Sequence, residues 1–256
     1  MVRLSVLALS VVGLASGSRQ PAQLSDLPSA QDTVQAGDAV VDATRLRPFS
    51  LVRHLTMTRR DTVKPFGRQS EQLTRDSLDG QTVLLDVLRF ETPNGRTVDS
   101  SWADPHTLRP FRMHSRNKAR LVSLEFDGRS VRGRTTPSID TPTTLDEQLD
   151  VRPFEWNLFG LAVSALPLRR GYRTTMPVYV ARFSRIVWYS VEVMRDTSLL
   201  RPNGRRAPVW EVLATGDSVV PSARFWVSQR HRFVDRVLLS EPGISIMYAR
   251  EPTPHR

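Results

Sequence analysis

The sequence contains no cysteine among its 256 residues. No disulfide can therefore hold the fold, and burial of apolar side chains has to stabilise it. The chain also lacks a P-loop, a G-x-G-x-x-G loop, and the H-E-x-x-H and G-x-S-x-G motifs of two hydrolase classes. These absences argue against a nucleotide cofactor and a recognisable metal site, so we expect no cofactor and no metal.

Long apolar runs are scarce, and one of them lies at the N-terminus. Arg3 precedes an apolar run from Leu4 to Ala15, and small residues follow up to Gly17. This order is typical of a secretory signal peptide, and the run is shorter than the roughly 20 residues that a membrane-spanning helix needs. We expect residues 1–17 to be a signal peptide cleaved near Gly17, the protein to be exported to the periplasm or cell envelope, and the mature chain to have no transmembrane span.

Lysine is nearly absent, although the net charge is +10. Lys64 and Lys118 are the only lysines, and all other cationic side chains apart from histidine are arginines. A basic balance can indicate nucleic-acid binding, but export and the even spread of the arginines argue against that partner. Two interpretations remain: arginine is simply the common surface cation, or the positive charge attracts anionic lipid head groups or a polyanionic envelope.

The chain is long enough for one β-rich domain with a sizeable core. Residues 18–39 are polar, small and without apolar periodicity, which predicts a flexible N-terminal segment. We expect a single domain over residues 40–250 and a C-terminal tail over residues 251–256.

Period-two alternation dominates from residue 81 onwards. Five extended segments follow one another up to residue 135, joined by short turns such as Asn94-Gly95 and Asp127-Gly128. Connections this short predict an antiparallel meander. Residues 135–150 carry prolines and scattered threonines, and we expect a loop there. Six further extended segments follow Gly171, and in one of them Val187, Tyr189, Val191 and Val193 form an apolar file.

One helix is expected, from Pro153 to the residue before Pro167, because proline suits a first helical turn and also marks the stop. Asn157, Gly160 and Ser164 share one narrow strip, and the rest of the circumference is mostly apolar. A helix this apolar has to be covered, and we expect it to fill the hollow of the sheet.

An eight-residue phrase occurs twice. Residues 42–49 read DATRLRPF and residues 104–111 read DPHTLRPF, 62 positions apart. A third, degenerate copy places Trp226 and Ser228 another 124 positions after Trp102 and Asp104. An aspartate side chain accepts hydrogen bonds from backbone amides two or three residues later, so we interpret the phrase as a recurrent strand reversal. Thr44 replaces His106 in the first copy, which argues against a catalytic or metal-binding pair.

The sequence gives little support for an enzyme. The histidines are His54, His106, His114, His231 and His255, and none lies in a spacing that recurs in hydrolases. We therefore expect no catalytic residue, and a hydrolase assembled from distant residues remains the least favoured alternative.

Several segments together resemble a known family: VDATRLRPF, WADPHTLRPF, LDVRPFEWNLFGLAVSALPLRRGYR, PVWEVLATG and FWVSQRHRFVDRVLLS. They resemble an exported bacterial family catalogued as domain of unknown function 3108, which looks like a relative of the LolA/LolB lipoprotein carriers. The resemblance runs from Val40 to Tyr248. It implies a mainly β (α+β) fold, with a curved antiparallel sheet or half-barrel and one covering helix. The third copy of the phrase departs from the family pattern at Gln229 and Arg230.

The favoured function is a non-enzymatic envelope role in which the space between sheet and helix binds a lipid or another hydrophobic ligand. A closed core uses the same residue types, and closed or nearly closed packing is the preferred interpretation. A different alternative is a structural module that recruits an envelope protein along a sheet edge. The residues expected to line a ligand site are Tyr189, Val191, Val193, Trp210, Trp226, Phe154 and Leu158.

Overall fold

The computed structural model describes residues 33–139, 141–201, 204–218 and 220–250. The expected signal peptide, residues 18–32 of the expected flexible segment, and the expected tail lie outside the described residues. Residues 33–39 differ from the expectation of flexibility. Val34 donates from its backbone N to the carbonyl O of Thr175 (2.9 Å), and Ala36 donates in the same way to Arg152 (3.0 Å). Both side chains are buried, so this short segment is part of the ordered domain.

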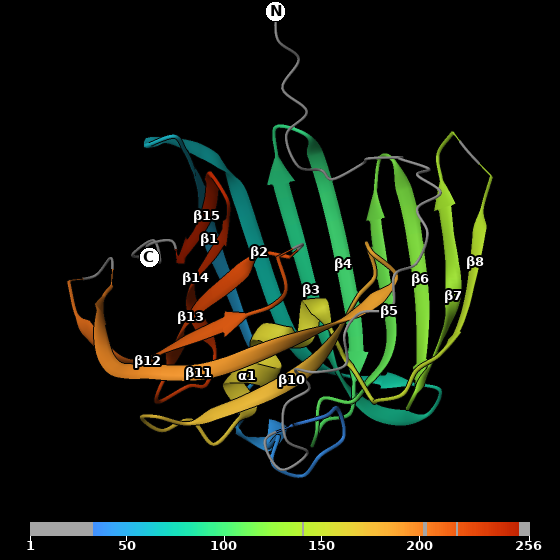
Figure 1. The fold of residues 1–256 in the computed structure, drawn as a ribbon, viewed down its shortest axis with the longest axis horizontal. Coiled ribbons are helices and arrows are strands. Elements are labelled where there is room, and N and C mark those ends of the chain that lie inside the picture. Colours follow the sequence, from blue (N-terminus) through green and yellow to red (C-terminus); the bar gives the residue numbers. More distant parts are fainter. Residues whose placement is uncertain (1–32, 140, 202–203, 219, 251–256) are drawn as a thin grey trace, which may run out of the picture.

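The described strands form one open sheet of 15 strands, in the order β8-β7-β6-β5-β4-β3-β2-β1-β15-β14-β13-β12-β11-β10-β9 (Figure 1). The mainly β class with a curved antiparallel sheet is thereby confirmed. Every neighbouring pair is antiparallel except β9 and β10. The bounds are β1 Phe49–Arg59, β2 Thr62–Leu78, β3 Gln81–Thr92, β4 Gly95–Ala103, β5 Pro110–Asn117, β6 Arg120–Asp127, β7 Ser130–Pro137, β8 Thr143–Gln148, β9 Phe154–Glu155, β10 Arg173–Val180, β11 Arg185–Leu200, β12 Arg206–Thr215, β13 Ser222–Ser228, β14 Val234–Glu241 and β15 Ile244–Arg250.

Two meanders, β1–β8 and β10–β15, meet where β1 pairs with β15. The strand register shifts at four places along the sheet, between β1 and β2, β4 and β5, β11 and β12, and β13 and β14. Such bulges bend a strand and increase its twist. In β2, Gly67 has φ +153°, and an added Cβ would lie 2.2 Å from the carbonyl oxygen of Glu91. Only glycine allows β3 to approach β2 this closely.

The sheet curls until β10 crosses in front of β3 to β5 (Figure 1). Met176 and Val178 of β10 belong to the main hydrophobic core, whereas Tyr179 packs into a second core with residues of β5, β6 and β7. The rings of Tyr179 and Phe126 meet edge to face, with centroids 5.9 Å apart. Side-chain packing, and not a further ladder of hydrogen bonds, therefore brings the two ends of the sheet together.

The predicted helix is shorter than expected. Residues 154–155 form β9, Trp156–Leu158 form a 3-10 turn (η4), and the α-helix α1 comprises Phe159–Ala165. The prediction of a helix start at Pro153 was wrong, because β9 pairs in parallel with β10 and Glu155 accepts a hydrogen bond from the backbone N of Asn157 (3.0 Å). The prediction for residues 135–150 was wrong in part, since β7 extends to Pro137 and Thr143–Gln148 form the edge strand β8.

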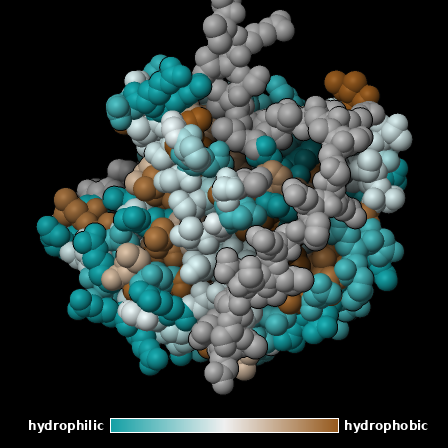
Figure 2. Space-filling model, viewed as in Figure 1, coloured by the Kyte–Doolittle hydropathy of each residue, from teal (hydrophilic) through white to brown (hydrophobic). Residues whose placement is uncertain are grey.

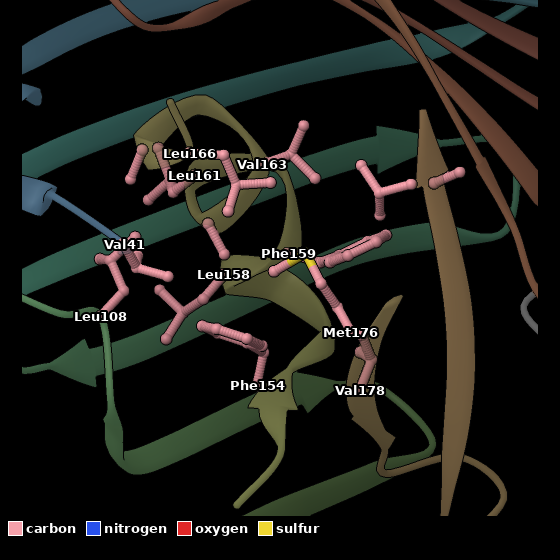
Figure 3. Close-up of a cluster of buried hydrophobic side chains, with 14 of the residues drawn as sticks. Val41, Leu108, Phe154, Leu158, Phe159, Leu161, Val163, Leu166, Met176 and Val178 are labelled. Carbon is pink, nitrogen blue, oxygen red and sulfur yellow. The ribbon is translucent and has the colours of Figure 1, made fainter. Parts of the chain in front are cut away.

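The position of α1 agrees with the expectation that it fills the hollow of the sheet (Figure 1). Figure 3 shows its side chains packed between the strands, together with Val41, Leu108 and Phe154 from other segments. Leu158, Phe159, Leu161 and Val163 are each no more than 2% exposed. Full burial of such side chains contributes about 1.5–3 kcal/mol each, so this short helix is a centre of the core despite its seven residues.

The repeated phrase forms turns, as expected from its aspartates. Oδ1 of Asp42 accepts from the backbone N of Thr44 (3.2 Å), and Oδ1 of Asp104 accepts from the backbone N of His106 (2.9 Å) and of Thr107 (2.8 Å). Burial acts to raise the pKa of Asp104, but the hydrogen bonds from His106 and Thr107 outweigh it and the pKa is lowered. The carboxylate is therefore held in its charged form.

The degenerate third copy adopts the same turn as the second. The backbone N of Asp104 donates to the carbonyl O of Arg109 (2.9 Å), and the backbone N of Ser228 donates to the carbonyl O of Phe233 (2.9 Å). Leu108 and Arg232, which are 124 positions apart, have φ values of 54° and 55°. Oγ of Ser228 accepts from the backbone N of His231 (3.2 Å). The departures at Gln229 and Arg230 leave this reversal intact, because serine supplies the side-chain acceptor.

All three copies meet near the C-terminal end of α1. The backbone N of Asp42 donates to the carbonyl O of Ala165 (3.1 Å), and the backbone N of Ala43 donates to that of His106 (2.8 Å). From the third copy, Nη1 of Arg232 donates to the carbonyl O of Leu166 (3.3 Å). Carbonyls at a helix end have no partner within the helix, and the repeated turns supply donors to two of them.

Replacement of Asp104 should destabilise the fold because three turn hydrogen bonds are lost together. We expect Asp104→Ala to lower the free energy of unfolding by about 1–2 kcal/mol in urea titrations. Asp127→Ala, at an exposed position beside the turn that joins β6 to β7, is the matched control and should change it by less than about 0.5 kcal/mol. Equal effects of the two substitutions would contradict the structural role assigned to the phrase.

Candidate functional site

A cavity of about 640 Å³ lies inside the curved sheet, beside η4 and α1. Its lining residues come from β3, β4, β5, β6 and η4 on one side, and from β10, β11, β14, β15 and two connecting loops on the other. Several of these side chains, including Phe90, Trp156 and Ile246, are only partly buried, so the cavity is open to solvent. The lining comprises Phe90, Thr97, Asp99, Met113, Ser115, Asn117, Arg120, Val122, Glu155, Trp156, Asn157, Val180, Ala181, Arg182, Phe183, Tyr189, Val220, Pro221, Leu239, Glu241, Ile244 and Ile246.

Aromatic rings join the cavity to the core beneath it. The ring centroid of Trp156 lies 6.0 Å from that of Phe159 and 5.8 Å from that of Tyr189. Phe159 in turn lies 4.9 Å from Tyr189 and 5.8 Å from Phe225. Trp156 and Tyr189 line the cavity, whereas Phe159 is fully buried below them. The expectation of closed packing therefore describes the surroundings of α1, and the open space lies next to it.

Glu155 lies at the inner end of the cavity and is 1% exposed. Burial raises its pKa to about 7, although hydrogen bonds from the backbone N of Asn157 and from Oγ of Ser101 (2.8 Å) act to lower it. Near neutral pH this carboxyl is therefore close to its midpoint, and protonation changes the charge of the cavity floor.

Further polar side chains continue from Glu155 across the inner face of the sheet. Ser101 of β4 lies opposite Asp86 of β3, and Arg53 of β1 contacts Glu71 of β2. Asp86 is 2% exposed, and within the described chain neither of its carboxyl oxygens has a hydrogen-bond partner. Burial and the neighbouring Glu71 charge raise its pKa well above the ordinary value. Burial thus favours the neutral form of Asp86.

The seven residues expected to line a ligand site are distributed unevenly. Tyr189 alone among them lines the cavity. Val191, Val193, Phe154 and Leu158 are at most 1% exposed and belong to the main core. Trp210 packs at the margin of that core below the guanidinium of Arg232 (4.4 Å to the ring centroid). Trp226 contacts Arg236 (5.7 Å) and pairs with Glu211, away from the lining residues. Binding by these residues stays a prediction.

The sequence pattern does not identify several of the residues that line the cavity. Thr97, Asp99, Ser115 and Asn117 are inward-facing polar residues of β4 and β5, and the sequence alone does not indicate which face of a two-sided strand is concave. Trp156 falls within the helix that the sequence predicts from Pro153, and that prediction does not place it at a cavity. Alternation in β4 separates Thr97 and Asp99 from Val98 and Ser100, but only the register and curvature of the sheet place the first pair in the cavity lining.

The described residues do not combine histidines or a cluster of metal ligands with the cavity. None of His54, His106, His114 and His231, the four histidines within those ranges, lines the cavity, and His114 packs on the other face of β5 against Trp102, with ring centroids 5.2 Å apart. No cluster of three or more potential metal ligands occurs in the described part of the chain. Among the described helices, none has the length and apolar character that crossing a membrane requires.

The outer surface contrasts with the cavity lining. Over the described residues visible in Figure 2, hydrophobic residues form separate small patches between hydrophilic ones. Many arginines on the outside are paired with carboxylates. Glu211, for example, accepts from Arg195 (2.8 Å) and from Arg224 (2.7 Å), and Asp235 accepts from Arg201 (2.9 Å). Much of the positive charge is therefore compensated locally.

Stability should depend on pH through Glu155. Its folded-state pKa of about 7 lies above the ordinary 4.5, so its contribution is fully present below pH 4.5 and is lost as the pH rises through about 7. This shift corresponds to about 3 kcal/mol. Urea titrations at about pH 5 and about pH 8 give the free energy of unfolding at each pH. We expect most of this amount to be lost from the unmodified protein between the two pH values, and not to be lost from Glu155→Gln. Glu125→Gln, at an exposed site, serves as the control. An unchanged pH dependence in Glu155→Gln would show that this carboxyl does not titrate as described.

Comparison with known proteins supplies the family. No curated protein matches the sequence. The model of a family described as protein of unknown function (DUF3108) matches residues 54–244. This range extends from within β1 to the start of β15 and therefore includes α1, most of the sheet and every residue of the cavity lining except Ile246. The chain accordingly belongs to the DUF3108 family of proteins of unknown function.

Proposed function

We propose that this protein is exported to the cell envelope, where it binds a hydrophobic or lipid-like ligand in the cavity and acts by binding, not by catalysis. The cavity carries this proposal. Its volume of about 640 Å³ falls within the roughly 300–1,000 Å³ that small-molecule sites occupy in proteins. Such sites combine an apolar and aromatic lining with a few convergent polar groups, and this lining has the same composition.

The apolar part of the lining supports a ligand with a substantial hydrocarbon portion. Val180 and Phe183 come from the β10–β11 hairpin, and Leu239, Ile244 and Ile246 come from the β14–β15 hairpin. An apolar group placed among these side chains leaves water without losing a hydrogen bond. Burial of about 200 Å² of apolar ligand surface would favour binding by about 5 kcal/mol before the costs of association.

Two sequence features support the location and the class. The order of charged, apolar and small residues in residues 1–17 is typical of a signal peptide. The family that the sequence motifs resemble looks like a relative of the LolA/LolB lipoprotein carriers, and such a relationship is consistent with a curved sheet that encloses a hydrophobic ligand. Carriage of a lipid within the envelope is therefore part of the proposal.

A second candidate is an interaction module that recruits an envelope protein along a sheet edge. The edge strand β8 pairs with β7 only, and four of its six side chains are exposed. However, Asp146 and Glu147 place charges on this strand, a common way of preventing strand addition. Asp146 accepts from Nε of Arg132 (3.2 Å), and Glu147 accepts from the hydroxyl of Tyr179 (3.1 Å).

Purified protein should retain a ligand from the cells in which it is produced. We expect extraction with organic solvent, followed by mass spectrometry, to release a compound with an acyl or other hydrocarbon chain in near-stoichiometric amount. The proposal is contradicted if the extracts are empty and the protein also fails to take up an uncharged apolar dye such as N-phenyl-1-naphthylamine. The interaction module would then be the better candidate.

Filling the cavity should abolish this binding without unfolding the sheet. Ile246 of β15 lines the cavity, whereas the side chain of its neighbour Met247 alternates to the other face. We expect Ile246→Trp to weaken binding of the uncharged dye at least about 10-fold, because the indole occupies ligand volume, and Met247→Trp to leave it within about 2-fold. Circular dichroism verifies that both variants fold. Equal dye affinity in the two variants would place the dye outside the cavity.

A further inference from the structure

Four polar side chains lie together on one side of the cavity. On the inner face of the sheet, Thr97 of β4 pairs directly with Asn117 of β5, and Asp99 pairs directly with Ser115. All four side chains line the cavity. We call these four residues the polar wall. Directly opposed residues in an antiparallel pair lie about 5 Å apart at Cβ, so the polar wall presents four hydrogen-bonding side chains over a compact area.

The rest of the lining differs from the polar wall. The hairpins β10–β11 and β14–β15 supply mainly apolar side chains, and Phe90 of β3 adds another next to Thr97. β10 and β11 cross in front of β3 to β5 in Figure 1, so apolar and polar surfaces line different sides of one space. An unbranched hydrocarbon fits the apolar side only. A ligand that fills the cavity needs polar groups on one side as well.

Asp99 is the polar-wall residue with the clearest requirement for a partner. Within the described chain, its Oδ1 is buried and has no hydrogen-bond partner. Burial raises its pKa, and a hydrogen bond from Ser115 and the charge of Arg120 only partly oppose this effect. An unsatisfied buried polar atom costs about 1–3 kcal/mol, which a donor group on a ligand would recover.

The charges that line the cavity do not favour a charged ligand of either sign. Arg120 and Arg182 line it, and so do the acidic residues Asp99, Glu155 and Glu241. Glu241 acts to raise the pKa of Arg182, although burial and the charge of Arg120 lower it. An anionic head group would meet Glu241 and the inner carboxyls, and a cationic one would meet the two arginines. The balance of charges suits an uncharged group that donates and accepts hydrogen bonds.

We infer that the ligand is an uncharged amphiphile that bears hydroxyl groups, such as a sugar or polyol joined to a hydrocarbon chain. Its hydroxyl-bearing part lies along the polar wall, where the carboxyl of Asp99 turns so that Oδ1 accepts a hydrogen bond from one hydroxyl. Its hydrocarbon part packs against Phe183, Leu239 and Ile246. This inference rests on the proposed function and specifies the chemical class of the ligand for that cavity.

Three probes with the same ten-carbon chain test this assignment: decyl glucoside, decanoate and decyltrimethylammonium. Calorimetric titration of each, below the concentration at which it forms micelles, gives its dissociation constant. We expect decyl glucoside to bind at least about 10-fold more tightly than either charged probe. Comparable or tighter binding of a charged probe overturns the inference but leaves the proposed hydrophobic site standing. Failure of all three probes to bind removes the proposed function and this inference together.

Substitution of Asp99 tests the contact itself. We expect Asp99→Leu to weaken binding of decyl glucoside about 10-fold. Asp99→Asn retains an acceptor and should bind the glucoside within about 3-fold of the unmodified protein. Ser100→Leu, on the opposite face of the same strand, is the matched control. Unchanged glucoside binding by Asp99→Leu would show that the hydroxyl groups lie elsewhere, and thermal unfolding verifies that each variant is folded.

Discussion

The packing of one apolar segment against the concave face of a single sheet is the constraint on which the rest of the structure depends. A sheet of 15 strands that bends this strongly leaves a hollow, and an empty hollow lined by apolar side chains would expose them to water. Residues from Phe154 to Leu166 fill one end of that hollow with nearly complete burial. Because the segment contacts β4 and β5 on one side and β10 on the other, it also fixes the distance between the two ends of the sheet.

The shortness of α1 follows from this role. A longer helix would extend into the space that Trp156, Asn157 and the polar wall now border, and the cavity would be filled. Instead the chain enters as β9 and turns through η4, where the carboxyl of Glu155 caps the turn. Burial of a carboxyl group costs free energy of desolvation. Stability alone therefore does not explain why Glu155 lies beside a cavity, and its position is consistent with the proposed binding.

The recurrence of the repeated phrase has a structural explanation that extends beyond strand reversal. The second and third copies reverse the chain between β4 and β5 and between β13 and β14, whereas the first precedes β1. All three end up beside the C-terminal carbonyls of α1, where the backbone of Asp42 and the side chain of Arg232 donate hydrogen bonds. The same local geometry is therefore used in both meanders, and the third copy shows that serine can replace aspartate as the acceptor.

Inner-face polar residues distinguish this cavity from a simple hydrophobic pocket. Asp86 and Asp99 both have buried carboxyl oxygens without partners in the described chain, but only Asp99 borders the open space. Asp86 is enclosed between β2, β3 and β4 and has no access to a ligand, so its neutral form has to be tolerated by the fold. This difference in access is the reason why the proposed ligand contact involves Asp99 and not Asp86.

Local pattern by itself determined much of this protein: the strands from residue 81 onwards, their short antiparallel turns, the turn-forming aspartates and the apolar segment before Pro167. These features depend on alternation, side-chain acceptors and backbone conformation within a few residues, all of which the sequence encodes directly. Only the tertiary structure decided where the helix begins, that Thr143–Gln148 pair as an edge strand, and which face of β4 and β5 borders a cavity. Those outcomes depend on the register and curvature of the whole sheet, which bring Tyr179 of β10 onto Phe126 of β6, and no local signal specifies them.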